Sequence, residues 1–202
     1  MTAVSDPDPT ATDVPVRDAA TVVLLRDGAD GTEVWLQQRS PSLVFAAGMH
    51  AFPGGAVDAA DRVQEVSGFA AEEHARVWGC DVDEARALVC AAVRETREEA
   101  DVELSPSSLR PWTRWVTPPG PPRRFDARFY VAALPEGSSP RPRTGEVHDA
   151  AWIVVRAAVE RHAAGDLPMW EPTITTLTEL APFDSVAEVL AAAPATIEAV
   201  TG

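Results

Sequence analysis

The stretch Arg94-Glu95-Thr96-Arg97-Glu98-Glu99 carries the strongest structural and chemical signal in the 202-residue sequence. On a helix, Glu95, Glu98 and Glu99 stand at positions i, i+3 and i+4, so their side chains share one patch. Carboxylates so close repel one another by about 4 kcal/mol per pair at an effective dielectric near ~20. Bound Mg²⁺ or Mn²⁺ would remove that cost, because hard divalent cations prefer carboxylate ligands. The pattern indicates a metal site, and a solvated acidic helix face is the alternative.

This acidic patch lies near the end of a predicted amphipathic helix. Asp81-Val82-Asp83-Glu84 resembles a capping box and opens a helix over about 83–100. Its small and apolar residues recur at helical spacing and form one packing face: Ala85, Val89, Ala92, Val93, Thr96 and Ala100. A shorter helix over 70–78 precedes it and ends at Gly79, a residue type favoured after helix ends.

Strand patterns surround this helical region on both sides. Residues 20–25 and 32–38 flank the turn-forming sequence 27–31, which is typical of a β-hairpin. Further strands are predicted over 112–116, 125–134 and 150–155, and helices over 156–164, 172–180 and 185–192. Strands that alternate irregularly with helices predict an α/β (α+β) fold, a mixed sheet sandwiched between helices with a helical C-terminus.

Composition limits the partners that this chain can take. The formal net charge of −14 opposes binding to nucleic acid or to anionic membranes. No apolar run reaches the ~20 residues of a membrane helix, and the first residues lack the pattern of a signal peptide, so a cytoplasmic location is expected. We expect a flexible segment over 1–18 and one domain over 19–202.

Gly54-Gly55, followed after a long interval by Arg-Glu-x-x-Glu-Glu, resembles the signature box of the Nudix hydrolase superfamily. The chain departs from that pattern in three ways. An insertion over approximately 62–82 lengthens the box, Asp61 stands where the family has an isolated glutamate, and Asp101 replaces a glycine. The resemblance implies a Nudix-type sheet between helices. The role of the insertion stays open between a lid and a dimer contact.

Several further segments resemble the coenzyme A diphosphatase branch of that superfamily. They are Gln38–Pro41, Ala51–Gly55, Ala59–Arg62, Arg123–Tyr130 and Glu171–Thr173. Around Arg39 the coenzyme A signature matches except that Val44 replaces its second arginine. The resemblance implies metal-dependent hydrolysis of coenzyme A or acyl-coenzyme A to 4′-phosphopantetheine, or its acyl form, and adenosine 3′,5′-bisphosphate. The alternatives are hydrolysis of ADP-ribose or dinucleotides, and a nucleotide-sensing module without catalysis.

The same resemblance implies residue roles. Glu95, Glu98 and Glu99 would bind Mg²⁺ or Mn²⁺, and Arg94 would orient Glu98 unless it forms an ordinary surface ion pair. Glu146 would act as the catalytic base or as a further metal ligand, with a plain loop acid as the alternative. The predicted substrate contacts are Arg39, Gly54, Gly55, Arg123 and Arg124. Arg123 and Arg124 could instead pair with neighbouring acids such as Asp126. The partner would be a small nucleotide diphosphate, and the oligomeric state, including a homodimer, stays open.

Overall fold

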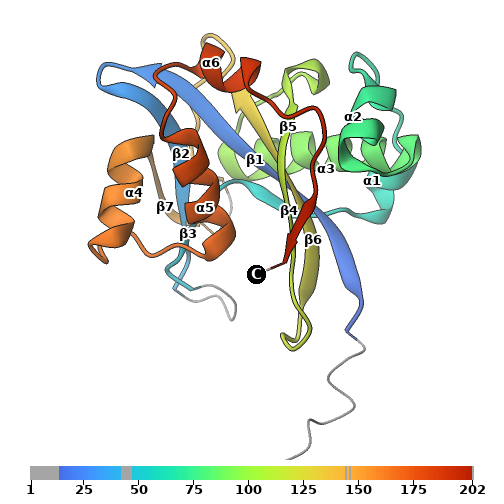
Figure 1. Cartoon of the computed structure of the whole chain (residues 1–202), viewed down its shortest axis with the longest axis horizontal. Helices are drawn as coiled ribbons and strands as arrows, with labels where there is room; N and C mark the ends of the chain where they lie inside the picture. Colours follow the sequence, from blue (N-terminus) through green and yellow to red (C-terminus); the bar gives the residue numbers. More distant parts are fainter. Residues whose placement is uncertain (1–13, 42–46, 144, 146, 202) are drawn as a thin grey trace, which may run out of the picture.

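A mixed eight-stranded sheet forms the centre of the molecule in the computed structural model, which describes residues 14–41, 47–143, 145 and 147–201 (Figure 1). The order of its main path is β3-β2-β1-β6-β5-β8, with β4 paired to β1 and β7 paired to β2. The strands are β1 (Val16–Gly28), β2 (Gly31–Arg39), β3 (His50–Ala51), β4 (Gly54–Ala56), β5 (Arg110–Val116), β6 (Arg124–Ala133), β7 (Val147–Val154) and β8 (Ala199–Thr201). The long central pair, β1 and β6, is parallel.

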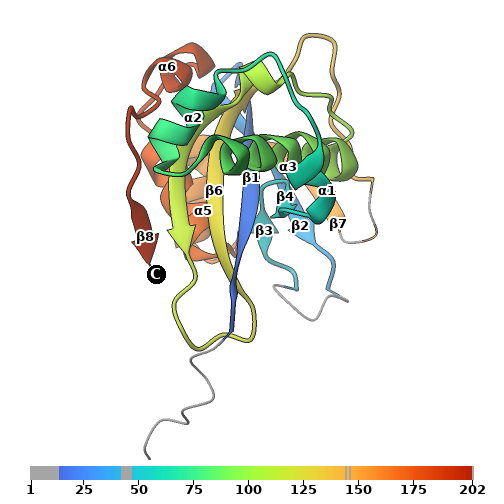
Figure 2. The same cartoon turned by 90° about the vertical axis from the view of Figure 1, so that its right-hand side faces the viewer.

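Helices cover both faces of this sheet, as Figure 2 shows for α3 on one side and α5 on the other. The helices are α1 (Ala59–Val63), α2 (Ala71–Trp78), α3 (Val82–Ala100), α4 (Val155–Ala163), α5 (Glu171–Leu180) and α6 (Val186–Ala191). A short 3₁₀ turn spans Pro106–Ser108. The predicted mixed sheet sandwiched between helices is thereby confirmed.

Alternation along β1 explains why the sheet is covered on both sides. Val22 and Leu24 are fully buried in the cluster beneath α2 and α3. Val23 and Leu25 are fully buried in the opposite cluster, which receives α4, α5 and α6. Because successive strand residues point to opposite faces, a continuous apolar run buries both faces of its strand.

The sheet forks where β1 leaves β2, and this fork positions the site described below. Leu25–Gly28 of β1 pair with β2, whereas Ala19–Thr21 of β1 pair with β4. The short strand β4 therefore fills the place beside β1 that β2 has left. Two residues separate β4 from α1, so the Gly54–Ala56 strand lies where the sheet continues into the helical region.

Most predicted elements match the structure within a few residues, including the 20–38 hairpin and the helices 70–78 and 83–100. The strands β3, β4 and β8 and the helix α1 were not predicted. β1 begins at Val16, inside the segment 1–18 for which we expected flexibility, because Val16–Asp18 pair with β6. Residues 1–13 of that segment lie outside the described residues. That 62–82 is an insertion and 19–202 one domain stays a prediction.

None of the helices in the described part of the chain combines the length and the apolar character needed to cross a membrane.

Candidate active site

The helix α3 carries the predicted glutamates in its last turns, and both of its ends are capped. The Asp81 side chain accepts a hydrogen bond from the Glu84 N–H (2.7 Å), as the predicted N-cap requires. At the other end, Asp101 adopts the left-handed conformation with φ 57°. Its carboxylate pairs with Arg141 and Arg143 at 2.6 Å each. An aspartate therefore ends the helix where the resemblance predicts glycine.

Glu99 is fixed against β4. Its side chain is buried, and its Oε2 accepts a hydrogen bond from the Gly54 N–H at 3.1 Å. A Cβ atom at Gly54 would lie 2.6 Å from the carbonyl oxygen of Ala20 and 2.8 Å from the Cα of Thr21. Because both atoms belong to the backbone of β1, only glycine lets β4 approach this closely. The glycine thus brings a main-chain donor to the carboxylate.

Glu95 lies against the next glycine. A Cβ atom at Gly55 would overlap the carboxylate of Glu95, so the absence of a side chain makes room for that group. Burial raises the pKa of Glu95 above its ordinary value, and the hydrogen bond and charge of Arg94 oppose that shift. Gly54 therefore allows the contact of β4 with Glu99, and Gly55 allows its contact with Glu95.

Arg94 connects α3 to α1. Its Nε and Nη2 donate to the two carboxylate oxygens of Asp61 at 3.0 and 2.8 Å. Asp61 is buried, and it also accepts the main-chain N–H of Asp58 at 2.8 Å. Bidentate pairs of this kind are strong and directional. Asp61 thus holds Arg94, a partner that the helical spacing of the sequence did not reveal.

Arg94 also contacts two of the glutamates. Its Nη1 donates to Glu95 at 2.7 Å and to Glu98 at 3.4 Å. Its shorter carboxylate contacts are therefore those with Asp61 and Glu95, and the contact that was predicted to orient Glu98 is longer than either.

Glu98 differs from the other two glutamates in its relation to the cavity. Its side chain is 46% exposed, and it does not line the cavity that Glu95 and Glu99 face. Within the described residues, no three Asp, Glu, His or Cys side chains are arranged to hold one metal ion together. Mg²⁺ is usually held by one or two carboxylates with the remaining ligands from water and substrate phosphates. Glu95 and Glu99 fit that requirement.

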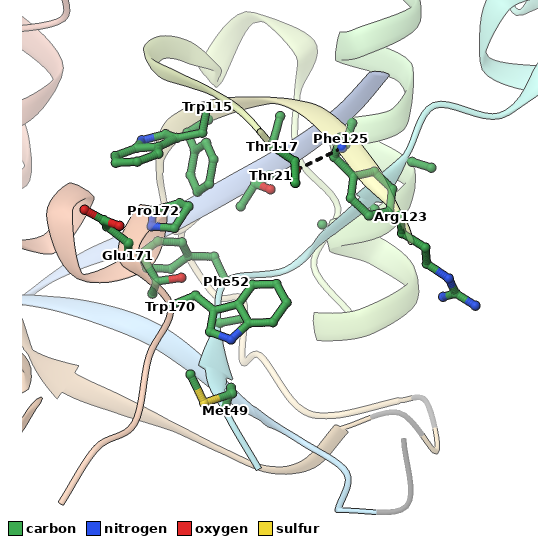
Figure 3. Close-up of a pocket in the computed structure, with 18 of the residues that line it drawn as sticks. Thr21, Met49, Phe52, Trp115, Thr117, Arg123, Phe125, Trp170, Glu171 and Pro172 are labelled. Atoms are coloured by element: carbon green, nitrogen blue, oxygen red, sulfur yellow. Dashed lines mark hydrogen bonds between the residues drawn. The ribbon is translucent and has the colours of Figure 1, made fainter. Parts of the chain in front are cut away.

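These two glutamates face a cavity of about 630 Å³. Its floor is the sheet face toward α5, formed by alternate residues of β1, of β6, and of β5 with the residue that follows it: Arg17, Ala19 and Thr21; Phe125, Ala127 and Phe129; Trp115 and Thr117. The side chains of Phe52, Trp170 and Pro172 surround the space from other directions (Figure 3). The cavity thus joins an acidic end to a large aromatic surface.

The predicted substrate arginines have different environments. Arg39 and Arg123 line the cavity, and Arg123 lies beyond Phe125 at the edge of the aromatic side chains (Figure 3). Arg124 is not among the lining residues; it donates to the main-chain carbonyls of Thr117 (3.2 Å) and Val14 (3.3 Å). Asp126 pairs with Arg114 and Arg128 instead of the adjacent arginines.

Two residues of the sequence argument, Val44 and Glu146, lie outside the described residues. His50 lines the cavity, and its Nδ1 lies 3.3 Å from the Pro168 carbonyl oxygen. Sequence reasoning missed Arg17, Trp115 and Trp170 as cavity residues. The alternation Arg17-x-Ala19-x-Thr21 would have placed Arg17 on the same face as Thr21, once β1 was known to begin at Val16.

No family model matches the sequence. The curated proteins include two relatives at low identity. A Caenorhabditis elegans protein named putative nudix hydrolase 7 is 24% identical over 179 residues, 81% of this chain and 60% of that protein. The human acyl-coenzyme A diphosphatase NUDT19 is 25% identical over 237 residues, 79% of this chain and 63% of that protein. The chain thus spans about three fifths of the length of these relatives.

A solved structure gives the stronger likeness. The crystal structure of a NUDIX hydrolase from Alicyclobacillus acidocaldarius superposes with a TM-score of 0.74 at 28% identity, covering 89% of this chain and 97% of that one. Together with the glycine-containing strand against the glutamates of α3, these likenesses define the class of protein that the chain resembles. It has the Nudix fold and is similar in sequence to Nudix hydrolases.

Proposed function

We propose that this protein is a divalent-metal-dependent diphosphatase that hydrolyses coenzyme A or acyl-coenzyme A. The products would be 4′-phosphopantetheine, or its acyl form, and adenosine 3′,5′-bisphosphate. One observation carries the proposal: Glu95 and Glu99, set against Gly54 and Gly55, line the same cavity as Arg39 and Arg123. A diphosphate is anionic, and the net charge of this chain is −14, so the substrate needs cationic partners. A metal ion at the glutamates and the two arginines would supply them.

The proposed roles follow from these contacts. Glu95 and Glu99 would hold Mg²⁺ or Mn²⁺, which when bound neutralises phosphate charge and acidifies water. Arg94, held by Asp61, keeps the Glu95 carboxylate in place. Gly54 donates its N–H to Glu99 and leaves the acidic end open to a phosphate group.

Three roles stay predictions within this proposal. Glu98 would reach the ion only by a change of its side-chain position, since it does not line the cavity. Glu146 would serve as the base or as a further ligand. Arg124 would bind phosphate only after giving up its hydrogen bonds to Thr117 and Val14.

Two observations support coenzyme A as the substrate. The Gln38–Gly55 region resembles the coenzyme A signature in Arg39 and in Phe52–Gly55. The human relative is named as an acyl-coenzyme A diphosphatase, at 25% identity. The large apolar part of the cavity, with Phe52, Trp115 and Trp170, also offers a surface for the adenine ring or the pantetheine arm.

A substrate panel tests the proposal. The purified chain is assayed with coenzyme A, an acyl-coenzyme A, ADP-ribose and a diadenosine polyphosphate, each with Mg²⁺ and with Mn²⁺. We expect the highest kcat/KM with coenzyme A or its acyl form. Turnover of ADP-ribose with inert coenzyme A would overturn the substrate assignment. Binding without turnover in either metal would overturn the diphosphatase and favour a sensing module.

A further inference from the structure

We propose that Arg17 binds a phosphate group of the substrate other than the scissile diphosphate. The substrate class is then a nucleoside diphosphate derivative that carries an additional phosphomonoester. This inference rests on the proposed function and deepens it. Neither the sequence pattern nor the coenzyme A signature assigned a role to Arg17.

The pairing of the arginines is the first argument. Only four guanidinium groups make no hydrogen bond or ion pair within the described part of the chain, namely those of Arg17, Arg39, Arg123 and Arg161. Three of these four, Arg17, Arg39 and Arg123, line the same cavity. In a chain with 31 acidic residues and 17 basic ones, leaving three arginines unpaired at one place indicates an anionic ligand.

Burial strengthens this argument at Arg39. Its Nε is buried and has no hydrogen-bond partner among the described residues. A buried donor without a partner costs about 1–3 kcal/mol, and more when the group is charged. Such a cost is understandable in a binding site, where a phosphate oxygen from the ligand would supply the missing acceptor.

The register of the sheet gives Arg17 a place distinct from the carboxylates. Thr21 of β1 pairs with Gly54, at the acidic end. Arg17 lies four residues earlier on the same face, about 13 Å along the strand. Its partner in the parallel register is Phe125 of β6. The floor between the two ends consists of small and apolar residues, Ala19 and Ala127, beside that phenylalanine.

These positions match a ligand of defined shape. A diphosphate at Glu95 and Glu99 leaves a flat apolar surface before Arg17, on which a base or a sugar can lie. A phosphomonoester on the far side of that nucleoside would then meet Arg17. Coenzyme A has such a group, the 3′-phosphate of its adenosine, whereas 3′-dephospho-coenzyme A has the same diphosphate without it.

This pair of substrates makes the test direct. The full chain and its Arg17→Ala variant are compared by kcat/KM on coenzyme A and on 3′-dephospho-coenzyme A. We expect Arg17→Ala to lower kcat/KM for coenzyme A about 10- to 100-fold, the loss typical of a charge-assisted hydrogen bond. The value for the dephosphorylated substrate should change less than about twofold. Arg161→Ala, which removes the unpaired arginine outside the cavity lining, should alter neither.

Equal losses on both substrates, or no loss on either, would overturn the role of Arg17. A binding experiment in EDTA separates this inference from the proposed reaction. By calorimetry the wild type should bind adenosine 3′,5′-bisphosphate more tightly than AMP, and Arg17→Ala should remove that preference. A preference without coenzyme A hydrolysis would sustain the anion site and overturn the proposed reaction. Equal binding of both nucleotides would overturn the anion site even if coenzyme A is hydrolysed.

Discussion

Gly54 and Gly55 are adjacent in the chain, but a side chain at each position would meet a different group. A side chain at Gly54 would meet the backbone of β1, which cannot move without breaking the sheet pairing. A side chain at Gly55 would meet only the carboxylate end of Glu95, which can rotate away. The first glycine therefore protects the fold and the second protects the position of a functional group.

This difference predicts opposite phenotypes for two neighbouring substitutions. Gly54→Ala should lower the free energy of unfolding by about 1–3 kcal/mol, as overpacking does. Gly55→Ala should leave stability nearly unchanged but lower kcat/KM up to about 100-fold, because the Glu95 carboxylate is displaced. Urea unfolding and steady-state kinetics measure the two effects. The same loss of stability in both variants would contradict the distinction.

Glu99 is the residue for which the expected effect on turnover is largest. Glu99→Gln keeps the shape of the side chain and the acceptor for the Gly54 N–H, but it removes the charge. We expect the fold to survive and turnover to fall by at least about 10²-fold. Far-ultraviolet circular dichroism and kcat with Mg²⁺ or Mn²⁺ provide the readouts. Unchanged kcat would remove Glu99 from the site.

At the scale of elements, a buried carboxylate of α1 forms an ion pair with Arg94 of α3. Asp61→Asn removes the charge that holds Arg94, and the side chain of Asp61 is 1% exposed. We expect a loss of about 2 kcal/mol in the free energy of unfolding, together with reduced activity. Asp83→Asn is the matched control, because its pair with Arg86 is exposed and should contribute less than ~1 kcal/mol. Equal effects of the two substitutions would refute the special role of Asp61.

Sequence patterns predict some of the elements and not others. The helix α3 was predictable because capping residues and a long 3.6-residue periodicity agree along it. The strand β4 was not, because Gly-Gly-Ala has little intrinsic strand preference and pairs only through the fork of β1. For the same reason, the partnership of Arg94 and Asp61 had no local signal: 33 positions separate the two residues.

At the scale of the whole molecule, the acid limit of stability should depend on Asp18. Burial alone would raise the pKa of this carboxyl, but hydrogen bonds from Arg62 and Arg128 outweigh it, and the pKa falls below its ordinary value of 3.8. Such a group stabilises the folded state above that value, and the contribution is lost as the pH falls through the folded pKa. Asp18→Asn should therefore destabilise the protein at pH 7. The gap from the wild type should narrow below about pH 4, as measured by urea midpoints. A gap independent of pH would contradict this assignment.

The molecule as a whole also separates what the sequence predicts from what only folding reveals. The mixed sheet between helices and the glutamate patch follow from periodicity and spacing. The cavity does not, because it joins residues of β1, β5, β6 and α3 with the segment before α5. No local sequence pattern indicates that Arg17 and Trp170 line this cavity. The cytoplasmic location and the oligomeric state stay predictions.

The most direct test of the central claim is titration of the protein with Mn²⁺, followed by electron paramagnetic resonance at about 0.15 M salt, where Debye screening weakens loose binding to exposed acids. The wild type and the exposed-acid control Glu72→Gln should bind Mn²⁺ equally, whereas Glu99→Gln should bind it at least about tenfold more weakly. Identical titrations for all three proteins would contradict a metal centre at Glu95 and Glu99.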